Sequence, residues 1–377
     1  MLWTVLFTYP LMVAVQVISA RIGRVTGKGL AANLLEIFPQ SAVVVLALLL
    51  FAANTINIGA DLAAMGAAAE LLAGRGATAF TIAVAIISLL LQVFVPYHRY
   101  VHYLKWATLV LFAYVGVVFT VHIDWLEVAA RILFPNVDFS AAWITMVVAI
   151  FGTTISPYLF FWQTSEEVED MEMKHRPDLR HASQTVARRE LRRMSVDTAT
   201  GMAISNLVAF FIILTTALTL HQSGVRDITT SAEAARALRP IAGTFAFLLF
   251  SLGIVGTGLL AVPVLAASAA YAMSEAFGLP KGLEKKPAEA RTFYGVIVGA
   301  VVIATGVVFM PLDPIKMLFW SAVLNGVISV PILAAMMILA RRRGPMGVYI
   351  ASGWQIGLGW AAVIVMAVAV GAMFLAG

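Results

Sequence analysis

The stretch Gly152-Thr153-Thr154-Ile155-Ser156-Pro157-Tyr158 gathers the residue types most able to do chemistry in this chain. It lies within an apolar run, where Pro157 removes a backbone donor and clashes with the preceding turn. We expect the helix to be broken there. A break frees backbone carbonyls inside the apolar run, where they can serve as oxygen ligands for a cation. The alternative is a simple proline kink in which the hydroxyls bind the carbonyls of their own helix.

A second polar group consists of Asn54, Asn57 and Asp61, within another apolar run. Asp61 is an ionisable residue deep in such a run, and residues of this kind usually pair or line a polar path. The asparagines precede it by seven and four residues, roughly on one helical face, so the three could edge a hydrated vestibule. Asn325 could add an amide oxygen to the site. For Asp61 and Asn325 alike, the alternative is a structural hydrogen bond between helices.

The composition of the chain indicates that these polar groups lie within a membrane-embedded protein. With 61% hydrophobic residues, 12% charged residues and a mean hydropathy of +0.92, the chain fits lipid and not a soluble domain. No cysteine is present, so a bound metal must be held by oxygen, imidazole or thioether groups. The sequence contains no His-Glu-x-x-His motif, no paired intramembrane aspartates and no Gly-x-Ser-x-Gly elbow. We therefore predict neither an enzyme nor a cofactor.

Apolar runs long enough to cross about 30 Å of hydrocarbon predict an all-α polytopic membrane protein with ten spans. The linkers between them are short, so one membrane domain is expected. The first run lacks a basic flank and a small-residue cleavage site, and we interpret it as an integral helix and not a signal peptide. The spans are 1–20, 40–73, 77–96, 104–123, 140–163, 198–221, 240–276, 293–312, 314–340 and 347–375.

Basic residues alternate between the two sets of linkers, and 19 of the 25 Lys and Arg residues fall on one side. The positive-inside rule makes that side cytoplasmic and places Met1 and Gly377 outside. The same rule explains the pI near 9.5 without invoking nucleic acid. The basic segment 174–193 could bind anionic lipid, but we prefer to interpret it as an ordinary cytoplasmic loop of the positive-inside kind.

Three motifs carry a family resemblance. Residues 16–27 (QVISARIGRVTG) resemble the end of the second helix of the Nramp metal transporters, and Gly59-Ala60-Asp61-Leu62-Ala63 resembles their third helix. Residues 152–158 fall where that family carries Gly-Ala-Thr-Val-Met-Pro-His. A weaker likeness runs through Leu312-Asp313-Pro314 and Val330-Pro331 to the C-terminus, although Asp313-Pro314 itself stands at a helix boundary. The resemblance implies a LeuT-like inverted-repeat fold with a site at mid-membrane.

The helix count suggests how the chain maps onto that fold. Five spans from residue 140 onward form one repeat (140–340), and the segment 347–375 is an additional C-terminal helix. Only four spans precede residue 140, so 1–123 is the remainder of the first repeat, without the family's first helix. That helix carries an Asp-Pro-Gly-Asn segment that binds metal in the family, and we expect it to be missing from the chain.

The resemblance also implies a ligand set. The family's sixth-helix ligands fall on the carbonyl of Thr153 and on Ser156, where the family has a methionine. A hydroxyl in place of a thioether favours hard ions such as Mn²⁺ and Mg²⁺, with Fe²⁺ also possible, as in the Nramp-related magnesium transporters. Tyr158 replaces the family histidine, and Ala64 replaces a glutamate three residues beyond Asp61. Neither replacement takes up a proton near neutral pH, which argues against proton coupling.

The sequence therefore predicts a secondary transporter of divalent metal cations that works by alternating access, as a monomer in a bacterial inner membrane, with lipid and metal ions as its partners. Two alternatives remain open. A LeuT-fold carrier of an organic solute such as an amino acid would share the broken helix. A truncated, non-transporting fragment would share the missing first helix.

Overall fold

The computed structural model describes residues 1–97, 99, 102, 106–221, 228, 230–310 and 313–376. These residues form helices and no strand, and they contain nine helical segments long and apolar enough to span a membrane. The all-α prediction is confirmed. The long helices are α1 (Leu2–Thr26), α3 (Gln40–Ala73), α4 (Ala77–Phe94), the pair α8 (Ala141–Thr154) and α9 (Pro157–Met173), α10 (Gln184–Thr216), α13 (Ala246–Ala276), α14 (Arg291–Val308), α15 (Pro314–Ala340) and α17 (Gly353–Ala376).

Nine of the ten predicted spans have a spanning helix as counterpart among the described residues. The motif residue Leu312 lies outside the described part of the chain. The run predicted at 104–123 also begins at residues outside it. Its described part forms only a short 3-10 helix η1 (Ala107–Phe112) and α6 (Ala113–Val117). The helix ends there in a turn, in which the Thr120 hydroxyl donates to the carbonyl of Val117 at 2.8 Å.

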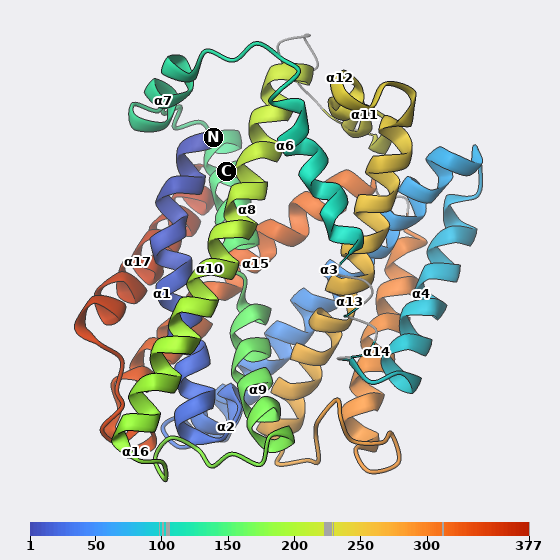
Figure 1. Cartoon of the computed structure of the whole chain (residues 1–377). Coiled ribbons are helices and arrows are strands. Elements are labelled where there is room, and N and C mark those ends of the chain that lie inside the picture. Colours follow the sequence, from blue (N-terminus) through green and yellow to red (C-terminus); the bar gives the residue numbers. More distant parts are fainter. Residues whose placement is uncertain are drawn as a thin grey trace.

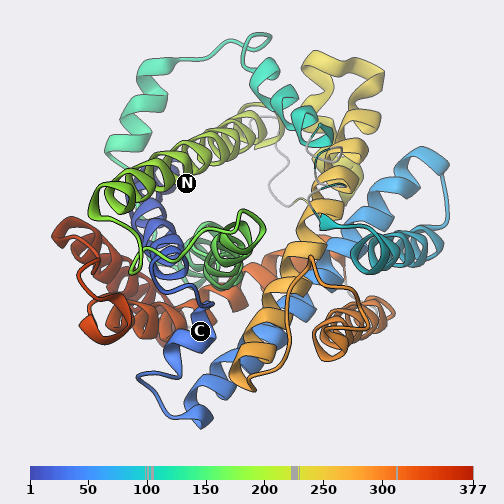
Figure 2. The same cartoon turned by 60° about the horizontal axis from the view of Figure 1, so that its bottom comes forward.

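Helix α3 runs through the middle of the bundle, where it packs against α4, α13, α14 and α15. Helix α1 packs against α9, α10 and α17, so it is an integral part of the fold, as predicted. Figure 1 shows α15 crossing the bundle at mid-height beside the junction of α8 and α9. Figure 2 shows α3 and α13 side by side over much of their length.

The linkers separate into two ends. Figure 1 shows both termini toward the end that carries α7 (Trp125–Leu133), α11 (Ser231–Ala235) and α12 (Arg239–Ala242). The opposite end carries α2 (Leu30–Leu34), α16 (Arg343–Met346) and the last turn of α9. The basic segments 174–193 and 341–343 lie at this second end, which agrees with the predicted sidedness.

The start of α15 confirms that Asp313-Pro314 is a helix boundary. Asp313 is the N-cap, and its Oδ1 accepts hydrogen bonds from the backbone nitrogens of Ile315 at 2.8 Å and Lys316 at 3.3 Å. Pro314 occupies the first helical turn, where its missing N–H leaves no hydrogen bond unmade.

Candidate functional site

The helix containing residues 152–158 is interrupted, as its sequence predicts. Helix α8 ends at Thr154 and α9 begins at Pro157, with Ile155 (φ −116°, ψ 58°) and Ser156 (φ −81°, ψ 135°) outside helical conformation. The side chain of Ser156 is buried, with 1% exposure, whereas Thr153 is exposed. Two half-helix ends therefore meet inside the bundle, which is the arrangement that exposes backbone carbonyls to an ion.

The hydroxyls at the break all bind carbonyls of α8. Ser156 Oγ donates to the carbonyl of Gly152 and to that of Thr153, the latter at 3.1 Å. Thr153 Oγ1 donates to Ala149 O and Thr154 Oγ1 to Ile150 O, each at 3.0 Å. These are the bonds that the proline-kink interpretation foresees. The two predicted ligand atoms, Thr153 O and Ser156 Oγ, are thus neighbours.

Their separation also suits a shared ion. In an octahedron with metal–oxygen distances of about 2.1 Å, adjacent ligands lie about 3.0 Å apart. The 3.1 Å between Thr153 O and Ser156 Oγ is close to that edge length. Ligation of one cation by both atoms would require the Ser156 hydroxyl proton to rotate away from the carbonyls of Gly152 and Thr153.

Close packing against α15 fixes the position of the break. A methyl group added at Gly152 would overlap backbone atoms of Ala322 and Gly326, and one added at Gly326 would lie 2.9 Å from the carbonyl oxygen of Val148. Both glycines are needed for α8 and α15 to approach this closely. Asn325 precedes Gly326 on α15, is 2% exposed, and has no hydrogen-bond partner for its Oδ1. A buried amide oxygen without a partner is available to a ligand.

Asp61 and Tyr158 lie beside the break. Tyr158 packs against the apolar cluster that contains Ile58 and Leu62 of α3, which lie three residues before and one after Asp61. The Asp61 carboxyl is close enough to act electrostatically on the phenol of Tyr158. Within the described part of the chain Asp61 has neither a hydrogen bond nor an ion pair, and it is only partly buried. Two of the predicted site residues, Asp61 of α3 and Tyr158 of α9, are therefore brought together.

The two asparagines of α3 point to different neighbours. Asn54 is fully buried, and its amide nitrogen donates to Leu265 O and to Ser268 Oγ on α13, each at 2.8 Å. The Oδ1 of Asn57 accepts from Ser321 Oγ on α15 at 3.0 Å. These are bonds between helices, so the two side chains join α3 to α13 and to α15. Sequence reasoning missed both serine partners, for which the local pattern gives no signal.

Comparisons with known proteins decide the family. The profile described as "Natural resistance-associated macrophage protein-like", Nramp, matches residues 1–376. The chain belongs to the Nramp family. The resemblance found in the three motifs is confirmed, and with it an integral membrane protein.

Two relatives of this Nramp chain are bacterial transporters, in agreement with an inner-membrane location. It is 27% identical over 271 residues to the "Divalent metal cation transporter MntH" of Pectobacterium carotovorum, covering 69% of this chain and 60% of that protein. It is 27% identical over 275 residues to the protein of the same name from Aeromonas hydrophila, covering 69% and 61%. The match thus spans about three fifths of these curated relatives' length.

Solved structures share the Nramp fold. A crystal structure of a mutant of the Eremococcus coleocola manganese transporter superposes with a TM-score of 0.72 at 16% identity, covering 98% of this chain and 78% of that one. The same transporter in complex with an aromatic bis-isothiourea substituted compound gives 0.73 at 15% identity, with the same coverage. The LeuT-like fold expected of a Nramp chain is confirmed.

The carboxylates at the far end of α9 divide between two roles. Glu169 is buried, accepts from Tyr271 Oη and from the backbone nitrogen of Leu283 at 2.8 Å, and so joins α9 to the linker before α14. Its carboxylate is therefore part of the packed interior and not of a solvated helix end. Glu167 and Asp170 instead line a cavity of about 280 Å³ with Arg24 of α1.

Arg24 is the ionic centre of that cavity, and sequence reasoning gave it no role beyond topology. Its guanidinium contacts Glu190 at 2.8 Å, Asp170 at 3.4 Å and Glu167 at 4.0 Å, while its own side chain is 5% exposed. The pairs link α1, α9 and α10. No group of three or more His, Cys, Asp or Glu residues has metal-binding geometry anywhere in the described ranges.

Proposed function

We propose that this protein is a secondary transporter of divalent metal cations that works by alternating access, with its site at the junction of α8 and α9. The observation that carries the proposal is the broken helix beside Asp61 in a Nramp fold. The carbonyl of Thr153 and the hydroxyl of Ser156 are the proposed ligands. Asn325 is a further candidate ligand, and Asp61, Tyr158, Asn54 and Asn57 border the route to them.

The proposed ligand set favours hard ions. It contains backbone, hydroxyl and amide oxygens with one nearby carboxylate, and neither sulfur nor imidazole. Oxygen sites of low charge leave much of the hydration of Mg²⁺ or Mn²⁺ in place. We therefore propose Mn²⁺ and Mg²⁺, and also Fe²⁺, as substrates, with weak discrimination among them. No cofactor takes part, and the metal is cargo.

We also propose that the chain divides into two structural repeats. The similar lengths of corresponding helices in the two halves support this division. Helices α3 and α13, with 34 and 31 residues, and α4 and α14, with 18 residues each, are matched in length and order. We assign 1–123 to the first repeat, 140–340 to the second and 347–375 to an extra helix. The protein is proposed to work as a monomer, without obligatory proton coupling.

Calorimetric titration of the purified protein with MnCl₂, MgCl₂ and a mixture of amino acids tests the substrate class. Saturable binding of the divalent ions and none of the amino acids supports the proposal. Binding of an amino acid alone supports the organic-solute alternative. Uptake of Mn²⁺ into reconstituted vesicles then separates a transporter from a protein that binds without transporting, which is the outcome expected of a non-transporting fragment.

A further inference from the structure

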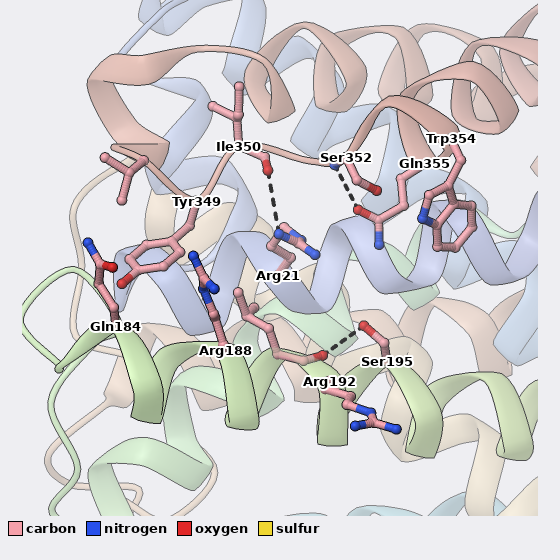
Figure 3. A pocket seen from close by; sticks show the side chains of 12 residues that line it. Arg21, Gln184, Arg188, Arg192, Ser195, Tyr349, Ile350, Ser352, Trp354 and Gln355 are labelled. Atoms are coloured by element: carbon pink, nitrogen blue, oxygen red, sulfur yellow. Dashed lines mark hydrogen bonds between the residues drawn. The ribbon is translucent and has the colours of Figure 1, made fainter.

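A second cavity, remote from the break, lies between α1, α10 and the segment that leads into α17. Its volume is about 570 Å³, within the range of ligand-binding pockets. Figure 3 shows Arg21 of α1 and Arg188 of α10 extending into the space beneath the segment from Tyr349 to Trp354. We call it the arginine cavity, after its lining residues Arg21, Arg188 and Arg192.

The positive charge of the arginine cavity is not balanced by acidic residues in its lining. Arg21, Arg188 and Arg192 form no ion pair within the described residues, and the lining contains no aspartate or glutamate. Arg193, on the same helix, lies instead in the acidic cavity around Arg24. Uncompensated guanidinium groups that converge on one space are typical of a site for an anion with several oxygens.

Two buried atoms in the lining lack partners. Arg21 donates through Nη1 to the carbonyl of Ile350 at 3.4 Å, but its buried Nε has no hydrogen-bond partner. The buried Oγ of Ser352 also lacks one. Gln355, which is 2% exposed, uses its Oε1 to accept from the backbone nitrogen of Ser352 at 3.0 Å. Buried donors without partners are rare in folded proteins, and here they line the basic space.

The surroundings of the arginine cavity are those of a membrane–water interface. Trp354 opens the spanning helix α17 and is 56% exposed, and Val348 is 80% exposed. Exposed tryptophan at the end of a span is typical of the headgroup level. The arginine cavity is lined by the start of α10 and by the segment after α16, which lie at the end of the bundle that bears the basic linkers, where the cytoplasmic leaflet supplies anionic lipid.

We infer that the arginine cavity binds the phosphodiester headgroup of an anionic phospholipid. The shared chemistry is that of a phosphate group, whose oxygens accept hydrogen bonds from Arg21, Arg188 and Ser352. The lipid is preferred to free phosphate because an exposed apolar rim stands beside the charged groups, where acyl chains would lie. This site is independent of the proposed metal site, and its occupancy does not require transport.

Native mass spectrometry of the detergent-purified protein tests the inference. The protein is titrated separately with dioleoyl phosphatidylglycerol, with dioleoyl phosphatidylcholine and with inorganic phosphate. We expect one phosphatidylglycerol to bind at least tenfold more tightly than phosphatidylcholine. The double variant Arg21→Gln/Arg188→Gln should lose about thirtyfold in phosphatidylglycerol affinity, since each guanidinium that hydrogen-bonds the phosphate inside the cavity contributes about fivefold.

Arg189→Gln is the matched control, because Arg189 is a neighbouring exposed arginine of α10 outside the arginine cavity. It should change the affinity by less than twofold. Arg188→Gln alone keeps the test available if the partly buried Arg21 is needed for folding. Equal binding of the two lipids, or an equal loss in Arg189→Gln, overturns the inference. Displacement of phosphatidylglycerol by an equimolar amount of inorganic phosphate would identify free phosphate as the ligand and overturn the assignment to lipid.

Discussion

Replacing Gly152 by Ala tests whether contact with α15 holds the broken helix in place. The added Cβ would lie 2.5 Å from the backbone nitrogen of Gly326 and nearer still to the carbonyl oxygen of Ala322. Both are backbone atoms, so no side-chain rotation can relieve the overlap. Helices α8 and α15 must therefore move apart, and the carbonyl of Thr153 and the hydroxyl of Ser156 move with α8.

The energetic cost follows from the kind of contact. Overpacking a tightly packed interior costs about 1–3 kcal/mol. An unfolding entropy of about 2.1 cal/mol/K per residue, applied to the whole chain, converts that cost into a fall in melting temperature of about 1–4 °C. Binding of Mn²⁺ should weaken as well, because the proposed ligands no longer keep their spacing from α15.

The assay compares melting temperature in detergent and calorimetric Mn²⁺ affinity for the wild type, Gly152→Ala and Gly299→Ala. Gly299 lies on α14, and a Cβ there meets nothing within 4 Å, so this control should lose neither stability nor affinity. If Gly152→Ala melts at the wild-type temperature and binds Mn²⁺ equally well, the packing argument for the break is refuted.

Three further predictions concern selectivity, coupling and stability. Ser156→Met should raise Cd²⁺ uptake relative to Mg²⁺ in vesicles, because sulfur prefers softer ions; an unchanged ratio would count against Ser156 as a ligand. Mn²⁺ uptake into vesicles loaded with a pH-sensitive dye should proceed without stoichiometric acidification, and acidification that disappears in Asp61→Asn would instead show coupling through that carboxyl. Arg24→Gln should lower stability by about 2 kcal/mol, since a largely buried arginine loses its charged hydrogen bonds; an unchanged melting temperature would contradict that role.

Much of the fold follows from local pattern. Apolar runs alone located nine spanning segments, because a lipid-embedded helix must satisfy its backbone internally and be apolar over its length. The break before Pro157 was also predictable, since proline acts through its own backbone geometry. The span predicted at 104–123 begins outside the described residues, and its described part forms only the short helices η1 and α6, so it stays a prediction.

Partners across the bundle were beyond local pattern. The pairing of Asn57 with Ser321, and of Glu169 with Tyr271, joins residues more than a hundred positions apart. Such pairs depend on which helix faces pack against each other. In a helix that is apolar on nearly all sides, the hydrophobic periodicity does not identify the face that packs against a neighbouring helix. The buried position of Arg24 could not be predicted for the same reason, because the sequence does not show which face of its helix packs against α9 and α10. In the sequence, Arg24 is only one of many basic residues near the end of a span.

The central claim is that a divalent cation binds at the junction of α8 and α9. The most direct measurement is an anomalous difference map from crystals of the protein soaked in MnCl₂. The account predicts a single strong peak about 2.2 Å from both Thr153 O and Ser156 Oγ, on the side toward Asp61. A map whose strongest peak lies among Glu167, Asp170 and Glu190, with no density at the break, would contradict it.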